Sequence, residues 1–247
     1  MAKYYDRAWN PIFGCQGKFV GCENCFAKEL MLKRSKDKNI KFEDVKINRN
    51  QFHKKFDDKS QLIAVCTQSD LFQDAIKDKF IDGIFRKCNN AKQHRFLFLT
   101  KYIDNMCDYF NTKNRISILN NGHINKFSFE NMIFGVTVCT NDDIHRIEKL
   151  KSIPHIKHRF IAFEPIMEEI KIDENMLNNI DWIILGANTN NHTEKCDIKW
   201  IKQIVNIAKK MNIPLFVNSI HLENGKVTSE FDEMPVELKC NEIPFIF

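Results

Sequence analysis

The run Met-Ile-Phe-Gly-Val-Thr-Val at residues 132–138 is apolar almost throughout. This pattern predicts a strand covered on both faces, as in a parallel sheet between helices. Six further runs of this kind occur, at residues 11–14, 62–66, 95–100, 159–163, 181–186 and 214–218. Helix-like stretches lie between most of them, at residues 24–36, 76–89, 103–110, 142–152 and 199–211. The alternation predicts repeated right-handed crossovers and an α/β fold.

The composition indicates one domain over residues 1–247. With 8 glycines and 6 prolines the chain has no linker rich in either, and its 43% of hydrophobic residues can form a sizeable core, which excludes wholesale disorder. We expect a flexible insertion at about 111–131, which is polar and asparagine-rich, and an acidic C-terminal extension at about 221–247. In the first helix-like stretch, Phe26, Ala27, Leu30 and Met31 are expected on one buried face.

No stretch of the sequence has the character of a membrane or export segment. The longest apolar runs are strand-sized, and the N-terminal residues lack an apolar signal core. We therefore expect a cytoplasmic protein with no membrane partner.

Positive charge is concentrated in the first quarter of the chain. Residues 1–60 hold 14 Lys and Arg against 8 Asp and Glu, whereas the whole chain has a formal net charge of only +5. One interpretation is a solvated basic helix followed by a basic loop through Arg49, Lys54 and Lys55. The other is a patch that binds a phosphate-bearing partner.

The strongest local signal is the loop Gly14-Cys15-Gln16-Gly17-Lys18-Phe19-Val20-Gly21-Cys22-Glu23-Asn24-Cys25. The two-residue gap lets the thiolates of Cys22 and Cys25 approach one metal centre, and the longer gap can bring in Cys15. A structural zinc site needs four ligands, which His53 could complete. A four-iron cluster held by three cysteines leaves one iron free for a substrate or cofactor. Unligated thiols are the third alternative, and the other six of the 9 cysteines are scattered singly.

Further polar residues stand where the expected strands end. In parallel α/β sheets, ligands collect at the carboxyl ends of the strands. The candidates there are Ser69, Asp70, Lys101, Thr137, Glu164, Gly186, Asn188 and Asn218. Ser69 and Asp70 could instead cap the following helix, and Lys101 is either solvated or a ligand of a substrate phosphate.

With these motifs in this order, the chain resembles the radical S-adenosylmethionine (radical SAM) superfamily. More closely it resembles a three-cysteine family of unknown function, encoded in phages and bacteria, that is related to those enzymes. The resemblance covers residues 9 to 218 and rests on the cysteine loop and on Trp9-Asn10-Pro11, Ser69-Asp70-Leu71-Phe72, Leu99-Thr100-Lys101, Gly135-Val136-Thr137-Val138, Glu164-Pro165 and Asp181-Trp182-Ile183-Ile184-Leu185-Gly186. It implies an incomplete (β/α) barrel of about six to seven parallel strands.

The chain also departs from these relatives. The usual cysteine spacing is C-x3-C-x2-C, whereas the first gap here is six residues. Relatives commonly have Gly-Gly-Glu where this chain has Gly186-Ala187-Asn188, and a lysine with a nearby tryptophan where it has Asn218-Ser219. Cluster binding is expected to persist, while substrate chemistry differs or is weakened.

The resemblance also implies the cofactors and their ligands. Cys15, Cys22 and Cys25 would hold a [4Fe–4S] cluster, and S-adenosyl-L-methionine would bind its fourth iron and release a 5′-deoxyadenosyl radical. Ser69 and Asp70 would lie near the methionyl amine of the cofactor, and Thr137 and Glu164 near its ribose or carboxylate. The Gly186-Ala187-Asn188 turn would approach the adenine, and Lys101 and Asn218 are candidates to contact substrate.

Three hypotheses about function follow. The first is a radical SAM enzyme of unknown reaction type that acts on a nucleotide, nucleic acid or other phosphate-bearing substrate and is reduced by a flavodoxin- or ferredoxin-type electron donor. The second is a non-catalytic zinc or iron–sulfur module, such as a nucleic-acid adaptor. The third is a degenerate family member that keeps the cluster without turnover.

Overall fold

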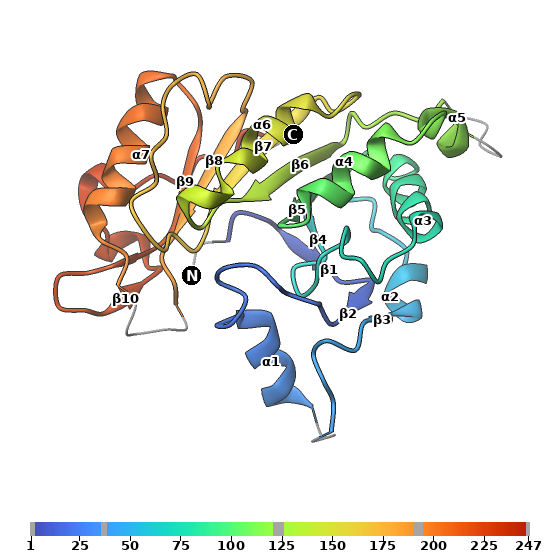
Figure 1. The fold of residues 1–247 in the computed structure, drawn as a ribbon, viewed down its shortest axis with the longest axis horizontal. Coiled ribbons are helices and arrows are strands. Elements are labelled where there is room, and N and C mark those ends of the chain that lie inside the picture. Colours follow the sequence, from blue (N-terminus) through green and yellow to red (C-terminus); the bar gives the residue numbers. More distant parts are fainter. Residues whose placement is uncertain (1–2, 36–38, 121–125, 190–194, 246–247) are drawn as a thin grey trace.

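A curled, mainly parallel sheet forms the centre of the computed structural model, which describes residues 3–35, 39–120, 126–189 and 195–245 (Figure 1). The eight strands follow the order β1-β4-β5-β6-β7-β8-β9-β10. They are β1 (Arg7–Trp9), β4 (Leu62–Val65), β5 (Arg95–Thr100), β6 (Met132–Thr137), β7 (His158–Phe163), β8 (Trp182–Gly186), β9 (Leu215–His221) and β10 (Val227–Thr228). All neighbours from β1 to β9 are parallel, and β10 is antiparallel to β9. The predicted incomplete barrel is confirmed.

The first strand of the sheet is not where the sequence pattern placed it. The predicted run 11–14 contains β2 (Ile12–Phe13), which pairs antiparallel with β3 (Lys46–Ile47) in a separate two-stranded sheet. The parallel sheet begins with β1, where Trp9 is opposite Val65 of β4. Pro11 has no backbone N–H for a sheet ladder, whereas Arg7, Ala8 and Trp9 all have one.

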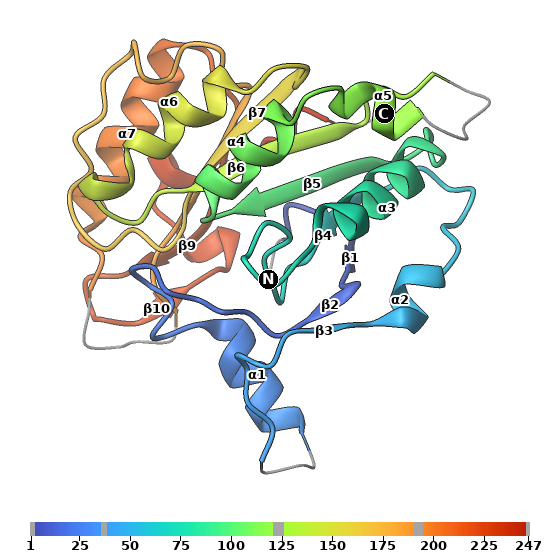
Figure 2. The same cartoon turned by 45° about the vertical axis from the view of Figure 1, so that its right-hand side comes forward.

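Helices cover the outer face of the sheet (Figure 1, Figure 2). Residues near both ends of the described chain pack against the concave face of the sheet. The outer layer contains α3 (Asp78–Asn89), α4 (Ile103–Asn111), α6 (His145–Ser152) and α7 (Ile198–Lys210). A smaller apolar cluster fills the concave face. It contains Leu62, Ala64, Leu97, Ile133, Phe160, Ala162, Trp182, Ile184, Phe216 and Phe245, with Tyr4 and Tyr5 packed against it.

The remaining helices are α1 (Phe26–Arg34), α2 (Arg49–His53), α5 (Arg115–Asn120) and the short turns η1 (Asn141–Asp143), η2 (Phe231–Glu233) and η3 (Val236–Leu238). Helix α1 forms as predicted, but its expected buried face does not. Only Ala27 is buried and Phe26 is 60% exposed, because α1 projects away from the sheet (Figure 2).

The two segments that interrupt the strand–helix alternation contain short helices and strands. Within 111–131, α5 carries the buried Arg115, which pairs with Asp78 at 2.5 Å and with Asp82 at 3.1 Å. Residues 121–125 of this segment lie outside the described part of the chain. In the C-terminal segment, Asn241 forms an antiparallel bridge with Phe216 of β9. Among the described helices, none is long and apolar enough to cross a membrane.

Candidate functional site

The cysteine loop, residues 14–25, lies between β2 and α1 and has no regular secondary structure before Phe26. It begins at a left-handed glycine, since Gly14 has φ +79° and a Cβ there would lie 2.5 Å from the carbonyl oxygen of Phe42. The next residue, Cys15, donates its backbone N–H to that same oxygen at 2.8 Å. Only glycine fits at position 14, and this turn determines where the backbone of Cys15 lies.

The segment after β4 holds the first half of this loop. The Ser69 hydroxyl donates to the Gly14 carbonyl at 2.6 Å, and the Gln73 amide donates to the Ser69 hydroxyl at 2.9 Å. The Gln73 side-chain oxygen accepts the backbone N–H of Gln16 at 2.9 Å. Gln73 is 1% exposed, so these bonds are shielded from water. In this structure Ser69 positions the cysteine loop, and its role toward a cofactor stays a prediction.

Two residues after β5 also hold the cysteine loop. The Tyr102 hydroxyl donates to the Gln16 carbonyl at 2.9 Å. The Lys101 ammonium donates to the Val20 carbonyl at 2.7 Å and lies 3.9 Å from the Cys22 sulfur. Lys101 is therefore half-buried against the cysteine loop, which places a positive charge beside one of the three predicted ligands.

The three thiols are free, half-buried and close enough to influence one another. Burial raises the pKa of the Cys15 thiol to about 12, and negative charge on Asp70, Cys22 and Cys25 adds to that rise. In the described part of the chain, no three His, Cys, Asp or Glu side chains are grouped tightly enough to hold a metal ion, with or without His53. The donor set still suits an iron–sulfur cluster, because three thiols share one loop beside a cation and bind iron as thiolates.

Asp70 is buried and fully engaged within the protein. Its carboxylate accepts the Thr100 hydroxyl at 2.7 and 2.9 Å, the Lys101 N–H at 3.0 Å and the Phe72 N–H at 2.9 Å. Burial raises its pKa, and these hydrogen bonds oppose that rise. Asp70 thus connects, through these hydrogen bonds, the two segments after β4 and β5 that hold the cysteine loop.

Glu164 directly follows β7, and Gly186 and Asn218 lie on the neighbouring strands β8 and β9. The Asn218 amide donates to the Glu164 carboxylate at 2.5 Å. A Cβ at Gly186 would lie 2.6 Å from the same carboxylate oxygen, so the side chain of Glu164 crosses β8 where that strand has no side chain. Burial raises the pKa of Glu164 and the bond from Asn218 opposes it. This carboxylate and amide face the concave side.

The two other predicted residues lie at the ends of β6 and β8. By strand alternation, Thr137 shares the concave face with Ile133 of the inner cluster. Its carbonyl accepts the Arg146 guanidinium at 2.7 Å. Asn188 is buried just beyond β8. Thr137, Glu164, Gly186 and Asn218 therefore form a polar rim above the apolar inner cluster.

Three further residues of this region, Gln73, Tyr102 and Cys139, are not among the site residues that the sequence predicts. Gln73 and Tyr102 carry no motif, although each follows a singled-out residue, Ser69 by four positions and Lys101 by one. Cys139 lies just beyond β6, and a Cβ at Gly21 of the cysteine loop would be 3.5 Å from its sulfur. Burial raises the pKa of Cys139 to about 11, and the Lys101 ammonium opposes that rise.

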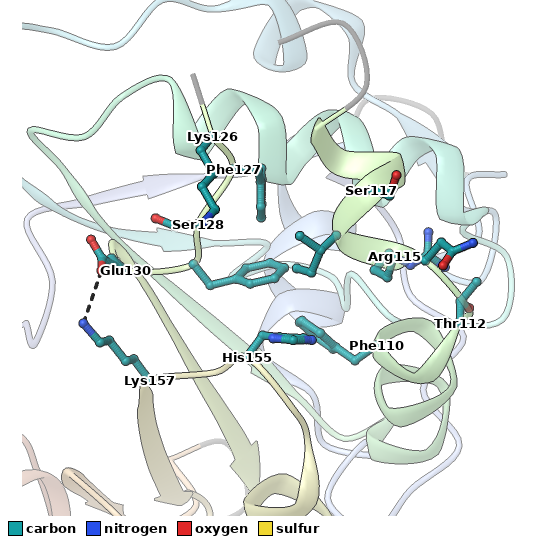
Figure 3. A pocket seen from close by; sticks show the side chains of 13 residues that line it. Phe110, Thr112, Arg115, Ser117, Lys126, Phe127, Ser128, Glu130, His155 and Lys157 are labelled. Carbon is teal, nitrogen blue, oxygen red and sulfur yellow. Dashed lines mark hydrogen bonds and ion pairs between the residues drawn. The ribbon is translucent and has the colours of Figure 1, made fainter. Parts of the chain in front are cut away.

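One cavity of the described structure, of about 600 Å³, lies away from these residues (Figure 3). Phe110, Arg115, Phe127, Glu130, His155 and Lys157 contribute to its lining, and Glu130 pairs with Lys157 at 3.2 Å. The segments 126–130 and 155–157 precede β6 and β7, so this cavity adjoins the amino ends of the strands. It contains none of the predicted site residues.

Comparison with known proteins identifies the family. The sequence matches the family described as "Protein of unknown function (DUF5131)" over residues 1–228. The chain belongs to this family. No curated protein matches it.

Two solved structures of spore photoproduct lyase are similar to this chain. A Cys-to-Ser variant has a TM-score of 0.42 and 11% identity, over 72% of this chain and 55% of that one. A Cys-to-Ala variant with a dinucleoside spore photoproduct has a TM-score of 0.44 and 10% identity, over 78% of this chain and 58% of that one. The chain thus spans little more than half the length of these proteins.

Proposed function

We propose that this member of DUF5131 is a radical SAM enzyme whose Cys15, Cys22 and Cys25 hold a [4Fe–4S] cluster. The observation that carries the proposal is the anchoring of the one loop that carries all three cysteines by the segments after β4 and β5, at the carboxyl end of an incomplete parallel barrel. Ligands of such folds collect at that end. When bound together, the cluster and S-adenosyl-L-methionine supply a 5′-deoxyadenosyl radical for reactions at unactivated positions.

The residues of this chain have separate tasks in the proposal. Ser69, Gln73 and Tyr102 hold the cysteine loop in place by the hydrogen bonds given above. Lys101 sets a positive charge 3.9 Å from the Cys22 sulfur, where it would offset part of the negative charge of a cluster bound by thiolates. The acceptors of the polar rim, above all Glu164 and Thr137, suit the ribose hydroxyls or the methionyl group of the cofactor.

Asn188 and the Gly186-Ala187 turn remain our candidates for the adenine end, and Lys101 and Asn218 for the substrate side. The reaction needs one electron from outside, so a flavodoxin- or ferredoxin-type donor belongs to the proposal. The substrate class we favour is a nucleotide, nucleic acid or other phosphate-bearing molecule.

Anaerobic reconstitution with iron and sulfide tests the cluster. The wild-type protein should take up about four irons per chain with broad visible absorbance, and should release 5′-deoxyadenosine when reduced with the cofactor present. Cys15→Ala, Cys22→Ala and Cys25→Ala should each lose the iron. Cys107→Ala, a half-buried thiol on α4, and Cys139→Ala, next to Lys101, should retain it.

Two results would count against the proposal. Equal iron loss in Cys139→Ala would show that the ligand set is different. A colourless protein with one zinc that Cys15→Ala abolishes would support the zinc module instead.

A further inference from the structure

A second cavity of about 650 Å³ lies between the β3–α2 segment and the start of α3. Four cationic side chains line it, namely Lys46, Arg49, Lys77 and Lys79. Lys46 and Arg49 come from the basic first quarter of the sequence, and Lys77 and Lys79 come from the start of α3. The fold therefore brings together positive charges that are about thirty residues apart in the sequence. None of its lining residues is acidic. We call this cavity the basic groove.

The charge of the basic groove is not neutralised by the protein. All four cations are exposed, and none has an ion-pair partner among the described residues. The acidic residue between the two lysines, Asp78, is paired with Arg115 at 2.5 Å. Helix α3 also begins here, and its N-terminal end adds positive potential. The groove is therefore complementary to a polyanion.

Aromatic side chains line the basic groove together with these cations. Phe52 and Phe80 are half-buried, with ring centroids 5.2 Å apart and planes inclined by 33°. Ile47, on the same wall, is 49% exposed. Cations that follow a phosphate backbone and aromatic rings that stack on bases are the features by which proteins bind single strands. A duplex would offer the groove phosphates only, because its bases are stacked within the helix.

We propose that the basic groove binds single-stranded nucleic acid, with phosphates on Lys46, Arg49, Lys77 and Lys79 and a base against Phe52 or Phe80. A volume of about 650 Å³ suits groups of nucleotide size. The inference deepens the proposed function, on which its catalytic meaning rests, by naming the substrate class.

The groove adjoins the cysteine loop. In the small sheet, Lys46 pairs with Phe13, and Phe13 is two residues before Cys15. The backbone N–H of Ala75, which lines the groove, donates to the Gln16 side chain at 3.1 Å, and neighbouring Asp74 pairs with Lys18 at 2.8 Å. A strand that leaves the groove on this side therefore passes along the loop that carries the three cysteines.

The test is fluorescence anisotropy of a labelled twelve-nucleotide oligo-dT with the whole protein. Lys77→Glu/Lys79→Glu places acidic residues at a helix start, where they are well tolerated, and should weaken binding at least tenfold. The magnitude of the slope of log K against log salt should fall by about 1.4, since two phosphate contacts to a single strand are lost. Phe52→Leu keeps apolar volume but removes stacking, and should weaken binding about fivefold or more.

A matched control carries the same change of charge elsewhere. Lys195→Glu/Lys199→Glu alters two exposed lysines, one just before α7 and one in its first turn, and α7 lies on the opposite side of the molecule from α2 (Figure 1). This control should change affinity less than threefold. Equal weakening by both double variants would overturn the proposal, because it would show diffuse attraction to net charge.

Competition experiments distinguish single-stranded nucleic acid from other ligands of the groove. Polyglutamate that competes as strongly as the oligonucleotide would overturn the proposal in favour of an acidic protein, and thymidine monophosphate that does so would favour a free nucleotide. Duplex of the same length that binds equally well would also overturn it. Cys15→Ala should bind the oligonucleotide like wild type, so loss of the cluster and loss of strand binding are separate results.

Discussion

At the scale of single residues, Gly186 determines how the polar rim is built. The Glu164 side chain passes over β8 at Gly186 and meets Asn218 on the strand beyond. Any larger residue at position 186 would occupy the space of that carboxylate. The absence of a side chain on β8 therefore brings together polar groups from two strands that are not neighbours.

Replacing Gly186 by alanine tests this arrangement. The added Cβ must either clash with Glu164 or turn it away from Asn218, so Gly186→Ala should lower the free energy of unfolding by about 1–2 kcal/mol. In a Glu164→Ala background the obstructing atoms are gone, and the same change should cost less than about 0.5 kcal/mol. Urea unfolding of the four proteins measures the coupling. Identical costs in both backgrounds would refute the arrangement.

Sequence reasoning located these residues but not their contacts. Strand-end position identifies Asp70 and Glu164, because periodicity reveals where a buried strand stops. The predicted strand end at Asn218 is wrong, since β9 continues to His221. Periodicity does not show that Asp70 bonds to Thr100 and Lys101, since this depends on how two loops meet. The structure shows that Gly186 makes room for Glu164, a contact that no sequence pattern indicates, and its approach to an adenine stays a prediction.

At the scale of elements, the cysteine loop depends on its neighbours for its shape. It has no helix or strand of its own before α1, so hydrogen bonds from the segments after β4 and β5 replace a regular backbone ladder. Gln73 is central because it both donates toward Gly14 and Ser69 and accepts from Gln16.

Gln73→Leu should therefore loosen the loop while leaving the sheet intact. It removes the partner of the Gln16 N–H, and we expect a loss of about 1–3 kcal/mol in the free energy of unfolding. Amide hydrogen exchange should accelerate at Gln16 and its neighbours but not in β5 to β8. Thr67→Ala is the control, because that hydroxyl in the same segment binds Asn10 instead. Unchanged exchange at Gln16 in the Gln73 variant would contradict the role.

The sequence predicts elements well where burial is symmetrical. The runs that became β4 to β9 are covered on both faces, so they are apolar throughout and easily recognised. Strand β1 is only three residues long and carries no such signal. Helix α1 has apolar residues at helical spacing, but Phe26 and Leu32 are 60% and 50% exposed in the described structure. Sequence periodicity does not show how far neighbouring elements cover a helix face.

At the scale of the whole molecule, both ends of the described chain pack on Trp182. Tyr4 makes an edge contact with its indole at 5.8 Å and Phe245 another at 6.0 Å. The indole N–H donates to the Glu242 carbonyl at 2.9 Å. The concave face is thus filled from both directions along the sequence.

Removing one of these contacts should affect the stability of the whole domain. Phe245→Ala deletes a ring that is 9% exposed and should cost about 3 kcal/mol. Val236→Ala, in the same C-terminal segment but 83% exposed, should change stability by less than about 0.5 kcal/mol. Thermal unfolding of both variants compares them, and similar melting temperatures would show that the C-terminal segment is not part of the core.

The antiparallel pairing along β9 also bears on how copies of this protein behave toward each other. An incomplete barrel has open edges, and an unpaired strand edge is a template for intermolecular sheet growth. Here β10 pairs with Ile220 and His221, and the segment 240–242 bonds to Leu215 and Val217. The opposite edge, β1, is only three residues long. The C-terminal segment therefore protects against aggregation, because it occupies the long edge that a neighbouring molecule could otherwise extend.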